Sequence, residues 1–303
     1  MVALFGPTGI GKTDVAIALA ALLRERGEDP MAVSADALQV YEGLEALTGA
    51  PTERERGLLE HRLVSFLPVT ETFSVGAYMP LAHAEVDAAL AAGRRPIVVG
   101  GTGLYLRAAL TDLSLAPAPP PELRERIEGE LHQRGAPALH AELATRAPSA
   151  AAAIEPTDST RVARALELLE MGEDPVHEGE ELWTDQVRRP TLLCGLTMER
   201  DALYARIDAR VEAIVAAGAA EEARRADAAG ASRTARAALG FEELLVGDVE
   251  TMKRRTRNFA KRQLVWMRKL AGAVEIDVTG RTADEVAAEV ASMLDPVSSG
   301  DSD

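Results

Sequence analysis

The stretch Gly6-Pro7-Thr8-Gly9-Ile10-Gly11-Lys12-Thr13 decides the fold of this 303-residue chain. Its spacing, G-x-x-x-x-G-K-T, is that of a loop whose backbone N–H groups surround phosphate oxygens. An apolar run at residues 2–5 precedes it and a helical pattern follows it, so the loop joins a strand to a helix. Lys12 adds a positive charge, and the Thr13 hydroxyl is a candidate ligand for Mg²⁺. The loop does not say which phosphorylated molecule it holds, or whether a phosphoryl group is transferred.

Strands and helices alternate after this loop. Apolar segments at 31–34, 61–66, 95–99 and 191–196 read as strands, and the patterns at 14–26 and 75–92 are helical. Residues 44–60 read as a loop. The alternation predicts an α/β fold with a parallel sheet flanked by helices, like that of P-loop NTPases. Ligands of such sheets gather at the carboxyl ends of the strands, where Gly6, Asp36 and Thr102 all fall.

A proline-rich segment, APAPPP at 116–121, interrupts this core. A helical pattern follows it, and a polar segment at 173–189 ends it. We therefore expect a core made of residues 1–111 and 189–303, with a small all-helical domain inserted at 112–188. The rest of the core is expected to be helical after 196, with helices at 201–217, 221–229 and 251–270, and residues 298–303 are expected to be disordered.

Composition excludes several classes of protein. No window holds about 18 uninterrupted apolar residues, so a membrane partner is not expected. The five residues before the loop are too short for a signal peptide. A single cysteine, Cys194, fits a reducing cytoplasm, and one cysteine with five scattered histidines argues against a structural zinc site. We take a monomer as the default.

A basic segment stands out because the chain carries a formal net charge of −15. Residues 251–274 contain no Asp or Glu but eight cations: Lys253, Arg254, Arg255, Arg257, Lys261, Arg262, Arg268 and Lys269. A solvated salt-bridge face would carry acidic partners within the same helix. We interpret the segment as a surface for the phosphate backbone of a nucleic acid.

Several polar residues are candidates for catalysis. Asp36 ends a strand beside the loop, where it could hold Mg²⁺ through water or act as a general base. The strand at 97–99 ends in Gly-Gly-Thr, without the Asp that holds Mg²⁺ in many ATPases. Thr102 could donate a hydrogen bond to a phosphate oxygen. Two arginine pairs, 161 with 164 and 206 with 210, are candidate anion clamps.

In five ordered pieces the chain resembles the bacterial tRNA dimethylallyltransferases, also called tRNA isopentenyltransferases. The pieces are GPTGIGKT at 6–13, SADALQVYEGL at 34–44, GGTGLYLRA at 100–108, RVARALEL at 161–168 and RNFAKRQLVWMRK at 257–269. The last is the most specific, because A-K-R-Q-x-x-W-x-R has no role in generic phosphate-loop kinases. Together the pieces span nearly the whole chain.

The resemblance implies that the exocyclic N6 amine of the adenosine adjacent to the tRNA anticodon attacks the allylic carbon of dimethylallyl diphosphate. The loop would hold the diphosphate, with Lys12, Mg²⁺ on Thr13 and Thr102 stabilising its charge as it leaves. Asp36 would accept the proton of the amine, and the target base would leave its stack. Of the remaining residues, Arg161 and Arg210 would bind diphosphate and His61 would line the site.

The resemblance also implies a set of contacts to the tRNA anticodon stem-loop. The set is Asp36, Ala37, Leu38, Gln39, Thr102, Arg124, Thr160, Arg161, Arg164, Lys261, Arg262, Gln263, Trp266 and Arg268, and residues 237–242 would contact tRNA as well. Three positions depart from the family pattern: Ala37 replaces a serine, Ala50 stands where a lysine is usual, and Glu242 replaces a cation.

Other functions fit parts of the sequence. A small-molecule kinase would share the phosphate loop, but the basic segment at 251–274 would have no role in such an enzyme. A dimethylallyltransferase acting on free adenine nucleotide would leave the inserted domain without a role. A tRNA-binding module without activity would not need a complete phosphate loop.

Overall fold

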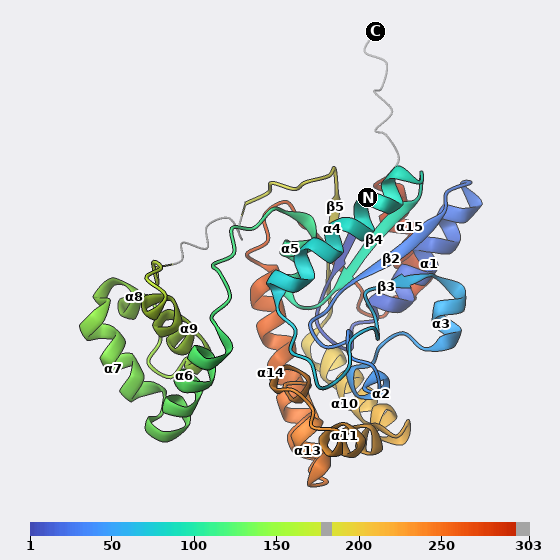
Figure 1. Cartoon of the computed structure of the whole chain (residues 1–303). Coiled ribbons are helices and arrows are strands. Elements are labelled where there is room, and N and C mark those ends of the chain that lie inside the picture. Colours follow the sequence, from blue (N-terminus) through green and yellow to red (C-terminus); the bar gives the residue numbers. More distant parts are fainter. Residues whose placement is uncertain (177–183, 295–303) are drawn as a thin grey trace. The chain divides into compact units, whose positions relative to one another are not determined.

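The structure, a computed structural model, describes residues 1–176 and 184–294 (Figure 1). The chain forms two compact units, one of residues 1–113 with 182–303 and the other of residues 114–181. The smaller unit therefore lies within the predicted insertion at 112–188. The expected disorder at 298–303 concerns residues outside the described part.

A six-stranded parallel sheet forms the centre of the larger unit, as the alternation of strands and helices predicted. The spatial order is β3-β2-β4-β1-β5-β6. Its strands are β1 (Val2–Phe5), β2 (Pro30–Ala35), β3 (His61–Arg62), β4 (Arg95–Gly100), β5 (Leu192–Thr197) and β6 (Val274–Asp277). The β1 strand lies between β4 and β5, where both of its faces are covered and all four of its side chains are buried. Burial on both faces explains its uninterrupted apolar sequence.

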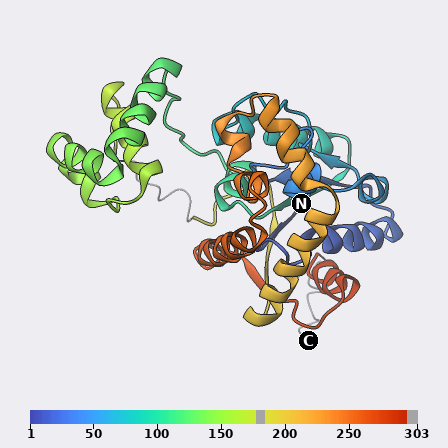
Figure 2. The ribbon, with the colours of Figure 1, turned by 90° about the horizontal axis from the view of Figure 1, so that it is seen from below.

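Helices cover both faces of the sheet. On one face α1 (Lys12–Glu25) and α15 (Ala283–Ser292) lie side by side, as Figures 1 and 2 show. Leu19 and Leu23 of α1 belong to the same core cluster as Val286 and Val290 of α15. On the other face α4 (Val75–Ala91) packs against α5 (Gly103–Leu110).

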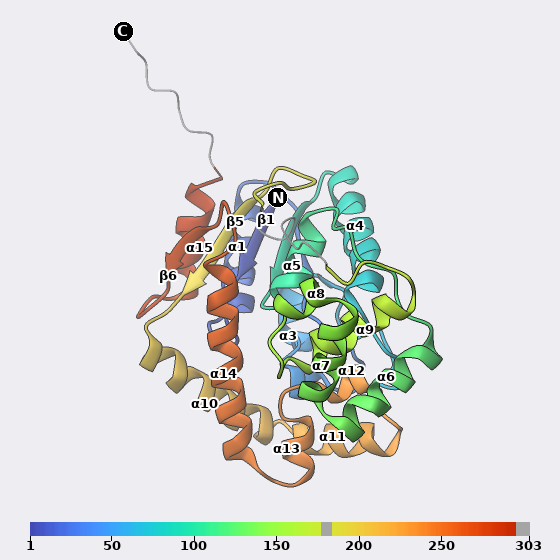
Figure 3. The same ribbon diagram turned by 90° about the vertical axis from the view of Figure 1, so that its left-hand side faces the viewer.

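The C-terminal helices bring distant segments beside the carboxyl ends of the strands. They are α10 (Arg200–Ala216), α11 (Ala219–Ala228), α12 (Arg233–Arg236), α13 (Phe241–Leu245) and α14 (Val249–Met267). Figure 3 shows α14 running past the sheet, and α14 packs against both α10 and α13. This packing places the basic segment next to the phosphate loop.

Three expectations about the larger unit were wrong. Residues 44–60, expected as a loop, contain α2 (Glu45–Thr48) and α3 (Glu53–Leu58), and Thr52 and Glu55 form a capping box at the start of α3. The strand expected at 61–66 ends after Arg62, because Leu63 and Ser65 have left-handed φ angles and residues 65–67 bond to the loop after β2 instead. The region after 196 is not purely helical, since β6 extends the sheet beside β5.

The smaller unit is all-helical. It consists of α6 (Pro121–Arg134), α7 (Ala136–Arg146), α8 (Pro148–Ala152) and α9 (Ser159–Glu170), visible together in Figure 2. Apolar side chains from these helices, including Ile127, Leu143, Val162 and Leu166, form a core of their own. The proline-rich segment before α6 has no regular secondary structure. Within the described residues of the whole chain, no helix is long and apolar enough to cross a membrane.

Candidate active site

The phosphate loop opens directly into α1. The helix begins at Lys12, after Gly11 in the left-handed conformation. The first N–H groups of a helix lack acceptors within the helix and attract anions. The Lys12 Nζ donates to the carbonyl oxygens of Gly6 at 2.9 Å and Pro7 at 3.0 Å. Burial, reinforced by the positive charge of Arg210, lowers the pKa of Lys12 to about 8.

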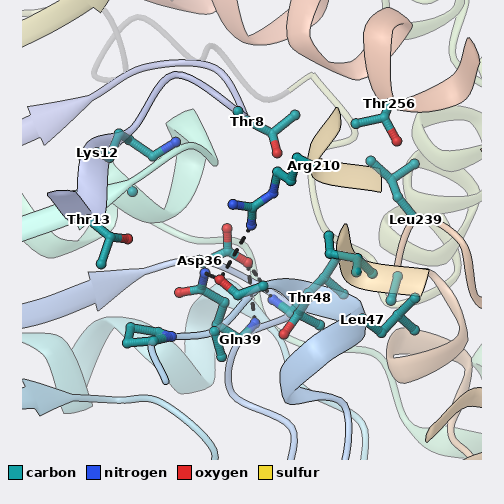
Figure 4. A pocket seen from close by; sticks show the side chains of 18 of the residues that line it. Thr8, Lys12, Thr13, Asp36, Gln39, Leu47, Thr48, Arg210, Leu239 and Thr256 are labelled. Atoms are coloured by element: carbon teal, nitrogen blue, oxygen red, sulfur yellow. Dashed lines mark hydrogen bonds between the residues drawn. The ribbon is translucent and has the colours of Figure 1, made fainter. Parts of the chain in front are cut away.

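A pocket of about 320 Å³ lies against this loop. Lys12, Thr13, Asp36, Gln39 and Arg210 line its polar part and reach it from α1, the segment after β2, and α10. Figure 4 shows these side chains around one hollow. A lysine and an arginine beside a helix N-terminus make this part suited to an anion with several charges.

Asp36 follows β2 and is held in a fixed orientation. Its Oδ1 accepts from the backbone N–H groups of Leu38 at 2.9 Å and Gln39 at 3.3 Å. The residue is half-buried at the pocket wall. A carboxylate oriented in this way can accept a proton from a bound molecule.

Arg206 and Arg210 of α10 take different positions. Arg210 lies in the pocket, and its Nη2 is 3.4 Å from the carbonyl oxygen of Gly49. Gln39 Nε2 donates to the same oxygen at 3.1 Å. Arg206 lies outside, where its Nε donates to the carbonyl oxygen of Gly9 at 3.0 Å. One arginine therefore faces the pocket and the other braces the phosphate loop.

An apolar wall forms the other part of the pocket, and the sequence did not predict it. Its side chains come from α2, α10, α14 and the segment before α13: Leu47, Val211, Ile214, Leu239, Met252 and Phe259. Val211 and Ile214 lie on the helix predicted at 201–217, where helical spacing indicates an apolar face but not a pocket. Leu47 lies in the four-residue helix α2 and Leu239 in the segment before α13, and both elements are too short for a periodic pattern to mark these residues. The pocket thus offers an anion-binding part and an apolar part side by side.

The basic helix α14 presents two kinds of cation. Contrary to expectation, three of its cations pair with acids, and all of these acids except Glu250, which lies in the first turn of α14, come from other elements. Lys253 Nζ lies 2.9 Å from Glu212 and 3.0 Å from Glu250, Arg257 binds Asp208, and Arg255 pairs with Glu243. The exposed side chains of Lys261, Arg262 and Arg268 form no ion pair with the residues that the structure describes, and they remain candidates for contact with a phosphate backbone.

Two residues of α14 predicted to contact tRNA face inward. Gln263 is 4 % exposed and bonds to two loops of the core. Trp266 is half-buried, with its ring packed over Gly103 at the start of α5. Both ends of the Gln263 amide are bonded within the protein, and the expected contacts of Gln263 and Trp266 with tRNA stay predictions.

His61 was expected to line the site and does not. It pairs with Ala32 in the middle of β2, whereas the pocket lies beyond the carboxyl end of that strand. Its Nδ1 is 2.6 Å from the Leu59 carbonyl oxygen, and burial lowers its pKa. Thr102 is the N-cap residue of α5, two residues after the pocket residue Gly100, and its role stays a prediction.

Four predicted site residues belong to the smaller unit. Arg161 is exposed, and its Nε lies 3.5 Å from Asp158 at the start of α9. Arg164 pairs with the buried Glu167 and donates to the carbonyl oxygens of Ala116 and Pro117. Arg124 also pairs with Glu167, at 3.5 Å. The contacts of Arg124, Thr160, Arg161 and Arg164 with tRNA, and of Arg161 with diphosphate, stay predictions.

Residues 39–270 match the family model described as IPP transferase, and residues 1–64 match the one described as isopentenyl transferase. The chain belongs to the IPP transferase family. It is 43% identical to the tRNA dimethylallyltransferase of Kineococcus radiotolerans, over 89% of this chain and 88% of that protein. It is 40% identical to the enzyme of the same name from Thermobifida fusca, over 89% and 87%.

Solved structures agree with membership of the IPP transferase family. The tRNA isopentenylpyrophosphate transferase of Bacillus halodurans matches with a TM-score of 0.69 and 32% identity, covering 96% of this chain and 94% of that one. A eukaryotic dimethylallyltransferase acting on tRNA matches with a TM-score of 0.71 at 23% identity, which supports the fold. The resemblance inferred from the motifs is confirmed.

The residues of the pocket of this IPP transferase suit a Mg²⁺ ion that is bound mainly by substrate phosphates. Among the described residues, no group of three or more acidic, histidine or cysteine side chains could hold a metal. Mg²⁺ is often bound through one or two protein oxygens together with substrate phosphates. Thr13 lines the pocket on the first turn of α1, beside the carboxylate of Asp36. The donors present suit an ion that arrives with a phosphorylated substrate.

Proposed function

We propose that this chain transfers the dimethylallyl group of dimethylallyl diphosphate to the N6 amine of the adenosine adjacent to the anticodon of tRNA. The observation that carries the proposal is one pocket with two parts. Lys12 and Arg210 line a cationic part, Leu47 and Met252 belong to an apolar part, and Asp36 lines the same hollow. A diphosphate ester of a short hydrocarbon matches these two parts, because one end of the molecule is anionic and the other end is apolar.

The proposed reaction forms a carbon–nitrogen bond. The amine nitrogen attacks the allylic carbon, and the carbon–oxygen bond to diphosphate breaks with its electron pair leaving on oxygen. The proton of the amine passes to the Asp36 carboxylate. Lys12 and Arg210 stabilise the charge that develops on the departing diphosphate, where fixed cations in a poorly solvated site act most strongly.

Mg²⁺ belongs to the proposal as a partner of the diphosphate. We assign the Thr13 hydroxyl as its protein ligand, and the ion would neutralise charge on the leaving group. Chelation of divalent ions should therefore stop transfer, and Thr13→Ala should raise the Mg²⁺ concentration needed for half-maximal rate. A Thr13→Ala variant with an unchanged Mg²⁺ requirement would remove Thr13 from this role.

The nucleic-acid partner is assigned to the exposed side of α14. Lys261, Arg262 and Arg268 offer cations there without acids in the same helix segment. The adenine must leave its stack to reach a carboxylate at the pocket wall, so binding is expected to flip the base. A tRNA anticodon stem-loop presents such an unpaired, accessible base.

The deciding experiment incubates the protein with Mg²⁺, labelled dimethylallyl diphosphate and either tRNA or AMP. We expect label on tRNA and none on AMP. Label on AMP alone would instead indicate an adenylate dimethylallyltransferase. A parallel incubation with γ-labelled ATP and small acceptors tests the kinase alternative, and phosphoryl transfer without prenyl transfer would contradict the proposal.

A further inference from the structure

Gln263 occupies an unusual place for a polar residue of a basic helix. It lies in α14 directly after Lys261 and Arg262, which are exposed, yet its own side chain is 4 % exposed and lines the pocket. A buried amide without partners would be costly, so its contacts matter.

Both ends of the Gln263 amide are bonded to backbone groups of the catalytic core. Its Oε1 accepts from the N–H of Thr8, in the phosphate loop, at 2.9 Å. Its Nε2 donates to the carbonyl oxygen of Gly101, in the segment between β4 and α5, at 2.7 Å. A primary amide carries an acceptor oxygen and a donor NH2 group, so a single side chain can satisfy two opposite backbone groups.

The second contact is made at a point where several groups converge. A Cβ atom at position 101 would lie 2.4 Å from Gln263 Nε2, 3.1 Å from the Gly6 carbonyl oxygen and 3.3 Å from Lys12 Nζ. The backbone of Gly101 therefore lies against both the phosphate loop and its lysine. Gln263 joins these two segments from the outside, 255 residues away from Thr8 in the sequence.

We propose that Gln263 is a positioning residue for the diphosphate site. It fixes the phosphate loop at Thr8 relative to the segment that carries Gly101 and Thr102, so that Lys12 and the start of α1 meet the diphosphate in one geometry. This inference rests on the proposed function only in taking diphosphate as the ligand of the loop. Contact with RNA is left to the exposed neighbours of Gln263 on the same helix.

The test compares three variants of the full chain. Gln263→Met keeps the length of the side chain and removes both hydrogen bonds. Gly101→Ala leaves the glutamine in place but pushes its amide away. Val265→Met is the matched control, because it introduces the same residue into the same helix at a position that is 51% exposed. Each variant is checked by thermal melting before its binding is measured.

Two affinities are measured by calorimetry: that of inorganic pyrophosphate with Mg²⁺, and that of an unmodified tRNA. We expect Gln263→Met and Gly101→Ala each to weaken pyrophosphate binding by about tenfold or more, the loss typical of a broken buried contact. Affinity for tRNA should stay within about twofold, as one neutral side chain adds little to phosphate-driven binding. The Val265→Met control should match the wild type in both.

The losses of pyrophosphate affinity in Gln263→Met and Gly101→Ala should not be additive. In the double variant Gln263→Met with Gly101→Ala, the second change should cost little, because the first has already broken the shared contact. Additive losses would overturn the proposal. So would a Gln263→Met variant that binds pyrophosphate normally but loses tRNA affinity, since that result makes Gln263 an RNA contact. If Gln263→Met melts below the assay temperature, Gln263→Glu decides in its place, because it keeps the acceptor for the Thr8 N–H and removes the donor to the Gly101 carbonyl oxygen.

Failure of this inference is separable from failure of the proposed function. Neither binding measurement requires prenyl transfer. A wild-type protein that binds pyrophosphate through Gln263 but labels no tRNA would refute the proposed function and leave the positioning role standing.

Discussion

The guanidinium of Arg210 lies against the backbone of Gly49, with Nη2 3.4 Å from the Gly49 carbonyl oxygen. Contact is so close that a Cβ at position 49 would lie 1.8 Å from that nitrogen. Gly49 also has a left-handed φ of 60°. Gly49, which follows the short helix α2, therefore leaves the space that the Arg210 side chain needs in order to reach the pocket.

Gly49→Ala should consequently displace Arg210. We expect pyrophosphate affinity to fall by about tenfold to a hundredfold, because a charged hydrogen-bonding group leaves the site. Gly43→Ala is the control: Gly43 also has a positive φ, of 78°, but nothing lies within 4 Å of its added Cβ. Both alanines carry a backbone cost of about 1–2 kcal/mol. Equal losses of pyrophosphate affinity in the two variants would contradict steric displacement of Arg210.

Diphosphate binding should depend on the protonation of Lys12. Its pKa is lowered to about 8 by burial and by Arg210, so the free protein loses this charge as pH rises through about 8. The dissociation constant of pyrophosphate should then increase by at most about tenfold per pH unit. Lys12→Arg keeps its charge and should flatten this step, and Arg210→Met should move it to higher pH. A step unchanged in Lys12→Arg would assign the titration to another group.

Asp36→Asn should separate proton transfer from structure. The amide oxygen can still accept from the N–H groups of Leu38 and Gln39, so the segment after β2 keeps its shape. Loss of the base should lower kcat by about 10²–10⁴-fold. Affinities for pyrophosphate and tRNA, measured in parallel, should remain near those of the wild type. A kcat within a few-fold of wild type would mean that Asp36 does not accept the proton.

Neutralising the exposed cations of α14 should change how salt affects tRNA binding. Lys261→Gln with Arg262→Gln removes two candidate phosphate contacts, so the slope of log K against log salt should become shallower by about one to two. Arg224→Gln with Arg225→Gln removes the same charge from α11, where both arginines pair with Glu221. That control should leave the slope unchanged. Equal slopes in all three proteins would place the RNA elsewhere.

The sequence predicted the architecture where a strong local signal and a buried strand coincided. A parallel sheet was predicted from the phosphate loop and from the apolar strands β1, β2, β4 and β5. Strands that are covered on both faces are continuously apolar. The strand β6 was not predicted, because it lies at the edge of the sheet and only its Ile276 side chain is buried. The strand expected after His61 ended early because the chain there bonds to the loop after β2, a contact with no local signature.

Site residues at strand ends were predictable, and those that depend on distant packing were not. Asp36 and Lys12 could be placed together because the carboxyl ends of parallel strands share one edge. The apolar wall joins Leu47 to Met252, about two hundred residues apart, which no periodicity reveals. The acids that pair with α14 also come from other helices, so their absence from residues 251–274 was misleading.

The packing of α15 on α1 has a consequence for synthesis of the chain. The phosphate loop is made first, but Leu19 and Leu23 of the helix that follows it lie in one core with Val286 and Val290. During synthesis, domains generally fold from the N-terminus as the chain emerges. Here the apolar face of α1 lacks part of its native cover until α15 has been made. The earliest motif in the sequence thus belongs to one of the last parts of the core to be completed.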